Sequence, residues 1–138
     1  MSYAVSGALQ AAIYAQLLGD GALGALVGSN IFDALPQGSL PSLYVSIGPE
    51  TAQEASDVSG AGAWHDFTVS VVTDNAGFQS AKDTAGAVSD ALVGADLTLS
   101  RGRLVGLWFR KAKATRETGG LRRIDLTFRA RVEDDLAA

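Results

Sequence analysis

The stretch "IDLTFRARV", residues 124–132, has the most regular pattern in the chain, because apolar and polar side chains alternate at every position. The apolar series consists of Ile124, Leu126, Phe128, Ala130 and Val132. Strict alternation is typical of a β-strand with one buried face, since successive side chains point to opposite sides of a sheet. We therefore predict a strand that buries this series and turns its arginines outward.

The residues just before this strand predict its partner. Leu107 and Phe109 alternate with Gly106, Trp108 and Arg110, and the strand continues into residue 113. The segment "ATRETGG" then ends in Gly119 and Gly120, which accept positive φ at low cost. Residues 105–132 are thus predicted to form a β-hairpin.

The remaining elements follow from the spacing of apolar residues, which recur every three or four residues in a helix and every second residue in a strand. Residues 5–18 have helical spacing, Gly19 breaks the helix, and Asp20 can cap a short second piece through Leu26. Strands are predicted at residues 43–47 and 64–73, and a second helix at residues 78–92. Residues 48–63 are acidic, small and Gly-rich without periodicity, so we expect a long mobile loop.

These elements occur in the order α-β-β-α-β-β, which predicts an α+β fold in a single domain over residues 1–138. We expect an antiparallel four-stranded sheet with two helices packed on one face. The predicted core consists of inward-facing residues from the three strands with the clearest alternation: Phe67, Val69, Val71, Leu107, Phe109, Ile124, Leu126 and Phe128.

Charge is divided unevenly along the chain. The first 100 residues carry Lys82 against ten carboxylates, about −9, whereas the rest carry ten Lys and Arg against five carboxylates, about +5. Such segregation suits nucleic acid, an acidic partner, or contact between opposite ends of two copies. The predicted docking residues are the outward cations of the hairpin: Arg110, Lys111, Lys113, Arg116, Arg122, Arg123, Arg129 and Arg131.

Motifs for enzymatic chemistry are weak. The glycines of "GDGALG" (residues 19–24) follow a helical stretch, whereas a dinucleotide fingerprint follows a strand. The only histidine, His65, adjoins Asp66, but strand neighbours point to opposite faces, so a structural or solvent-facing role is favoured. Glu50, Glu54 and Asp57 lack the spacing of a calcium loop. With no cysteine either, we expect no enzyme activity, no metal site and no cofactor.

Two further features bear on partners and location. Trp64, Trp108 and Phe109 lie near the basic residues, as a stacking platform for single-stranded nucleic acid would, although aromatics at strand spacing are more often core or subunit interface. The N-terminal segment lacks the positive region of a signal peptide, and polar residues interrupt any membrane-spanning run. We therefore expect a soluble protein of the cytoplasm that does not associate with membranes.

Four segments, in order, resemble the tail terminator (tail-completion) proteins of long-tailed phages and of phage-like gene-transfer-agent particles. They are "LQAAIYAQLLGDGALGALVGSNIFDALP" (residues 9–36), "LPSLYVSIG" (40–48), "HDFTVSVVTDNAGFQSAKDTAGAVSDAL" (65–92) and "LRRIDLTFRARVED" (121–134). The likeness covers nearly the whole chain and rests on this succession of elements.

The resemblance implies a structural virion protein without a cofactor. In that family six subunits form a ring on the last tail-tube ring, stop tube polymerisation and join the tail to the head-side connector or stopper, while double-stranded DNA passes through the lumen. The expected partners are thus further copies of this chain, the tail-tube protein and the head-side stopper, first in the bacterial cytoplasm and then in the tail. Another head–tail joining component, such as a stopper or a tail tube, remains an alternative, as does a small nucleic-acid-binding module.

Overall fold

The strand that contains the opening stretch lies inside a β-sheet. β5 (Arg122–Glu133) pairs antiparallel with β3 (Gly62–Thr73) on one side and with β4 (Arg103–Arg116) on the other. The computed structural model describes residues 3–55 and 62–134, and within them the strand order is β1-β2-β3-β5-β4. The other strands are β1 (Ile31–Phe32) and β2 (Leu43–Glu54). The helices are a 3-10 turn, Tyr3–Val5, and α1 (Ser6–Gly19), α2 (Gly21–Val27) and α3 (Gln79–Leu92).

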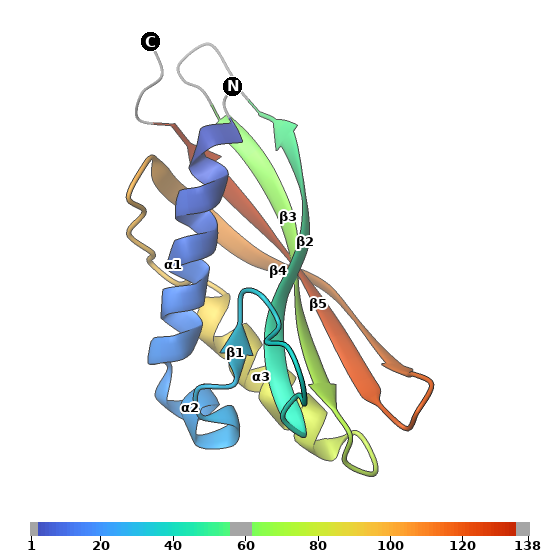
Figure 1. Cartoon of the computed structure of the whole chain (residues 1–138). Coiled ribbons are helices and arrows are strands. Elements are labelled where there is room, and N and C mark those ends of the chain that lie inside the picture. Colours follow the sequence, from blue (N-terminus) through green and yellow to red (C-terminus); the bar gives the residue numbers. More distant parts are fainter. Residues whose placement is uncertain (1–2, 56–61, 135–138) are drawn as a thin grey trace.

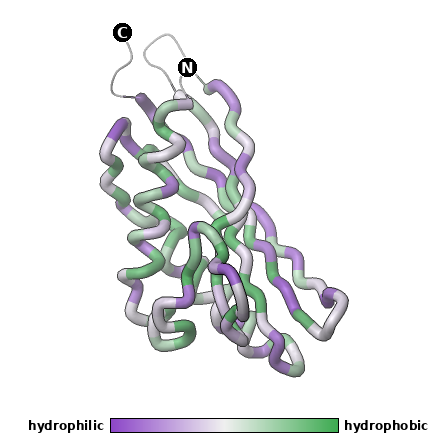
Figure 2. Tube along the Cα trace, viewed as in Figure 1, coloured by the Kyte–Doolittle hydropathy of each residue, from purple (hydrophilic) through white to green (hydrophobic). Residues whose placement is uncertain are grey.

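Alternation along β5 matches its burial residue by residue. Ile124, Leu126, Phe128, Ala130 and Val132 are buried, and the residues between them are half-buried. Phe128 is fully buried, with its ring stacked on Phe67 at 5.6 Å and edge-on to Phe109 at 5.9 Å. Figure 2 shows the same alternation of hydrophilic and hydrophobic residues along the β4–β5 hairpin.

Three α-helices cover one face of this sheet (Figure 1). α1 buries Leu9, Ile13 and Leu17, and α3 buries a stripe that includes Ala81, Ala85, Val88 and Leu92. The small side chains of α3 let its backbone approach β3 and β5 closely. The helices and the inward face of the sheet share one apolar cluster.

The predicted four-stranded antiparallel sheet with two helices is wrong in three respects. The described sheet has five strands, it is mixed because β1 runs parallel to β2, and three α-helices accompany it. β1 spans only two residues, too few for a period-2 pattern to appear in the sequence. The third helix arises because Asp20 has extended backbone angles and accepts a hydrogen bond from the Leu23 amide at 2.9 Å, which ends α1 and caps α2 as a separate helix.

The predicted loop over residues 48–63 is also corrected. β2 continues to Glu54, β3 already begins at Gly62, and their pairing reaches Glu54↔Ala63. The register shifts between Ile47 and Glu50, where Gly48 and Pro49 form an irregularity that hides the alternation in the sequence. Residues 56–61 of the expected loop lie outside the described residues.

The eight predicted core residues fall into two groups. Seven are buried: Phe67, Val69, Val71, Leu107, Ile124, Leu126 and Phe128. Phe109 is 44% exposed although it points to the helix side, because β4 is the edge strand and α3 leaves this part of it uncovered. A second irregularity places Val105 outside the regular pairing, so this side chain is 48% exposed.

Candidate docking surface

The eight predicted docking cations divide between the two strands of the hairpin. Arg122, Arg123, Arg129 and Arg131 lie on β5 and are half-buried, whereas Arg110, Lys111, Lys113 and Arg116 lie on the edge strand β4 and are exposed. An inner strand has neighbours on both sides, which can supply partners for its side chains. An edge strand has a neighbour on one side only.

Arg129 is the most firmly held of the β5 cations. Its Nε and Nη2 donate to the two carboxylate oxygens of Asp66 at 2.8 and 3.1 Å, and its guanidinium lies 5.1 Å from the ring centre of Trp64. The hydrogen bond from Arg129 lowers the pKa of Asp66 below its ordinary value in spite of partial burial, and it raises the pKa of Arg129. This bidentate pair fixes Arg129 on its own sheet.

The other β5 arginines also have partners within the chain. Arg131 donates to the Ala55 carbonyl at 2.7 Å and also lies 5.1 Å from the Trp64 ring centre. Arg123 donates to Asp125 at 2.8 Å and to the Ser70 hydroxyl at 3.1 Å. Arg122 donates to the Asn75 carbonyl at 3.1 Å and lies over the ring of Phe78.

The β4 cations have no such partners. Among the described residues, Arg110, Lys111, Lys113 and Arg116 form no ion pair and no side-chain hydrogen bond. Arg116 even lies opposite Arg122 in the β4–β5 register, and like charges in that position destabilise a sheet. Four exposed charges that the described fold does not pair are available for a partner. We call these four residues the β4 cation row.

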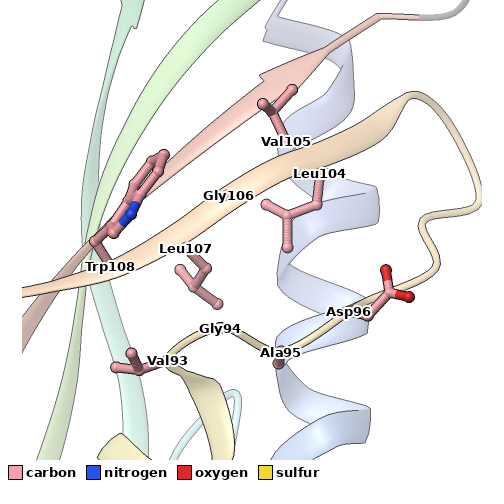
Figure 3. Close-up of a pocket in the computed structure, with 9 residues that line it drawn as sticks. All are labelled: Val93, Gly94, Ala95, Asp96, Leu104, Val105, Gly106, Leu107 and Trp108. Carbon is pink, nitrogen blue, oxygen red and sulfur yellow. The ribbon is translucent and has the colours of Figure 1, made fainter.

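Two hollows lie beside β4 on the helix side of the sheet, whereas Lys111 and Lys113 of the β4 cation row lie on the outer face, opposite Thr127 and Asp125. One, of about 280 Å³, lies between α3 and β4, and its lining residues include Lys82, Phe109 and Ala112. The other, of about 400 Å³, lies between β4 and residues 93–96, with Leu104 and Leu107 directed toward it (Figure 3). Strand β4 thus carries lysines on the outer face of the sheet and exposed apolar surface on the helix side.

The aromatic residues do not form one stacking platform. In the register Trp108 lies opposite Arg129 on the outer face, whereas Phe109 lies opposite Phe128 on the helix side. Trp64 is on the outer face, 6.0 Å from Trp108, and the guanidinium groups of Arg129 and Arg131 approach it. Trp108 also covers Gly106, where an added Cβ would come within 2.5 Å of the indole ring.

His65 lies on the helix side of β3 and is fully buried, while Asp66 faces the opposite side. Its Nδ1 is 3.2 Å from Glu50 Oε2, and its Nε2 has no partner among the described residues. Glu50 also accepts hydrogen bonds from Ser6, at 2.5 Å, and from the Tyr3 hydroxyl. This polar cluster ties the start of α1 to β2 and β3. The sequence pattern does not reveal it, because it places Glu50 in a loop.

The pKa of Glu50 reflects two opposing effects. Burial alone would raise it, but the hydrogen bonds from Ser6, Tyr3 and His65 together hold it below its ordinary value. A carboxylate with a lowered pKa stabilises the fold fully above its unfolded pKa of about 4.5, and the contribution is lost as the pH falls through the folded value.

We therefore expect Glu50→Gln to lower the free energy of unfolding at pH 7 by about 1–3 kcal/mol, the range for hydrogen bonds to a charged group. The variant should lose less stability than the wild type on acidification below pH 4.5, because it lacks the titrating carboxylate. Urea unfolding at several pH values measures both effects, with the exposed Glu117→Gln as control. Equal acid slopes in wild type and Glu50→Gln would contradict this assignment.

The other residues considered as candidates for a functional site are parts of helices and strands or lie outside the described residues. Gly19, Gly21 and Gly24 lie at the end of α1 and within α2, without a strand before them. Glu54 ends β2, and Asp57 lies outside the described residues. Over residues 3–55 and 62–134, no three His, Cys, Asp or Glu side chains gather as a metal-ion site. No helix in the same ranges is long and apolar enough to cross a membrane.

Comparison with known proteins finds a matching family and similar solved structures. The family model described as "Tail completion protein gp17" matches residues 11–133. A solved chain from the "Virion of native gene transfer agent (GTA) particle" is 65% identical, with a TM-score of 0.91 over 96% of this chain and 99% of the other. No curated protein sequence matches.

Proposed function

The chain belongs to the tail completion protein gp17 family, a family of virion structural proteins, and we propose that it caps the head-proximal end of a phage-like tail tube. In this proposal copies of the chain, most simply six, form a ring on the last ring of the tube and stop its growth. The ring joins the tube to the head-side stopper, and double-stranded DNA passes through its lumen.

One observation carries this proposal: the match to a protein of a gene transfer agent virion extends over 96% of the chain at 65% identity. At this identity and coverage the two chains share much of their surface as well as their fold. A role as a structural part of a tail follows from the likeness, and the finer role at the end of the tube is our inference.

The distribution of charge supports an assembly role. A net charge of −4 and four β5 arginines held by internal partners leave few cations for phosphate, and weak phosphate contacts let DNA slide. The β4 cation row is instead placed for an acidic protein surface. We therefore restrict the docking proposal to Arg110, Lys111, Lys113 and Arg116.

Removal of the protein from a particle-producing cell tests the role. We expect tubes of uncontrolled length and DNA-filled heads without tails, because nothing ends the tube or joins it to the head. Negative-stain imaging of tube lengths and of joined particles measures both effects, and the wild-type chain supplied in trans should restore them. Tubes of normal length beside unjoined heads would indicate a stopper instead, and the absence of any tube would indicate the tube protein.

A further inference from the structure

The hollow between α3 and β4 is a mostly apolar groove whose lining includes one charged residue, Lys82. Its floor and walls are Phe109, Ala112, Ala114, Ile124 and Leu126 from the sheet, with Ala85, Gly86 and Ser89 from α3. Lys82 also lines it, whereas Lys111 and Lys113 of the β4 cation row face the other side of the sheet. Its volume of about 280 Å³ gives room for a branched aliphatic side chain. We call it the α3–β4 groove.

A matching feature lies at the opposite edge of the sheet. The loop between β1 and β2 is exposed at every residue from 33 to 40, yet it carries Leu35 and Leu40, which are 50% and 40% exposed. Pro36 and Pro41 stiffen this loop, so that little conformational freedom remains to be lost on docking. Its charged residue is Asp33, and it contains no cation.

We propose that the β1–β2 loop of one copy docks into the α3–β4 groove of the next copy, with Leu35 and Leu40 as the apolar anchors. The loop carries apolar side chains and Asp33, whereas the groove is apolar with Lys82 in its lining, so the two surfaces are complementary in hydrophobicity and in charge. This inference rests on the proposed ring and names the surfaces that close it.

The sheet order explains why the partner is a second copy. β1 and β4 are the two outer strands, so the loop after β1 and the groove beside β4 lie at opposite edges of the sheet. A contact between two different patches of the same chain is heterologous, and its repetition closes into a ring when the rotation allows it. Every copy then offers one loop and one groove, and none is left unfilled.

Cross-linking tests the contact directly, because the chain contains no cysteine. A chain with both Leu35→Cys and Ala112→Cys should give a ladder of covalent oligomers when assembled tails are treated with a short bismaleimide. Each single variant should stay monomeric, since a heterologous contact does not bring two identical positions together. A mixture of the two single variants should give dimers and nothing larger.

Thr51→Cys with Ala112→Cys is the matched control and should stay monomeric, because Thr51 is exposed on the outer face of β2.

Three results would overturn the contact. They are a doubly substituted chain that stays monomeric in normal tails, a single variant that cross-links to itself, and a product whose mass shows a different tail protein. In each case the capping role would still be tested separately, by the length of the tubes in the deletion strain. Failure of the contact is therefore distinguishable from failure of the capping role.

Discussion

Phe128→Asp is expected to leave the chain unfolded at 25 °C. Phe128 is fully buried in the middle of β5, between the rings of Phe67 and Phe109. Truncating a buried Phe costs about 3–5 kcal/mol, and an unpaired buried charge adds several more. The sum is of the same size as the total stability of about 5–15 kcal/mol that is usual for a domain. Circular dichroism and urea unfolding measure the loss.

The neighbouring residue is the matched control. Thr127 is half-buried on the outer face, so Thr127→Asp introduces the same charge where water can reach it. We expect that variant to fold, with stability within about 1 kcal/mol of the wild type, because exposed substitutions rarely cost more. A folded Phe128→Asp protein beside an unfolded Thr127→Asp protein would show that the strand register is displaced by one residue.

The elements that could be predicted are those in which the spacing of apolar residues repeats several times. β5 shows five alternations, β3 nearly as many, and α3 carries an apolar stripe, so their type and position follow from the sequence. The Asp20 cap is equally predictable, because the chemistry of a cap is local. The sequence also predicts the break at Gly19 and the short helical piece after it, but the order α-β-β-α-β-β counts this piece together with the first helix, so the predicted count of helices is wrong.

The missed elements depend on contacts distant in sequence. β1 is a strand only because Ile31 and Phe32 lie beside β2, and a two-residue segment has no pattern of its own. The outer half of β2 is polar and begins at a register shift, so only its pairing with β3 makes it a strand. Local sequence contains neither fact.

The docking cations show the same limit of prediction from the sequence pattern. Alternation indicates that Arg123, Arg129 and Arg131 lie on the outer face, but it does not indicate whether a neighbouring strand supplies a partner. Arg129 is held by Asp66, 63 residues away in sequence, whereas Lys111 lies opposite Thr127 and is unpaired among the described residues. Strand order decides the difference, and strand order is the part of the topology that the sequence pattern does not contain.

The difference between the paired β5 cations and the unpaired β4 cations predicts a variant that folds and does not assemble. Lys111→Glu with Arg116→Glu should leave the stability of the isolated protein unchanged within about 0.5 kcal/mol, because neither side chain has an internal partner to lose among the described residues. The new carboxylate at position 116 would even face Arg122 with opposite charge, in place of the present like-charged pair. Joined particles should nevertheless fall by about 100-fold or more, since about 3 kcal/mol of like-charge repulsion at each contact corresponds to two factors of ten.

Arg129→Glu separates this effect from a folding defect. That substitution removes the bidentate pair and places a second negative charge beside Asp66, so both stability and assembly should fall. The double β4 variant should lose assembly alone, and Lys111→Gln with Arg116→Gln should lose less, because neutral side chains remove attraction without adding repulsion. Particle counts by imaging, set against urea unfolding of each purified chain, measure the two properties independently. Normal particle numbers from the double Glu variant would exclude the β4 cation row as a docking surface.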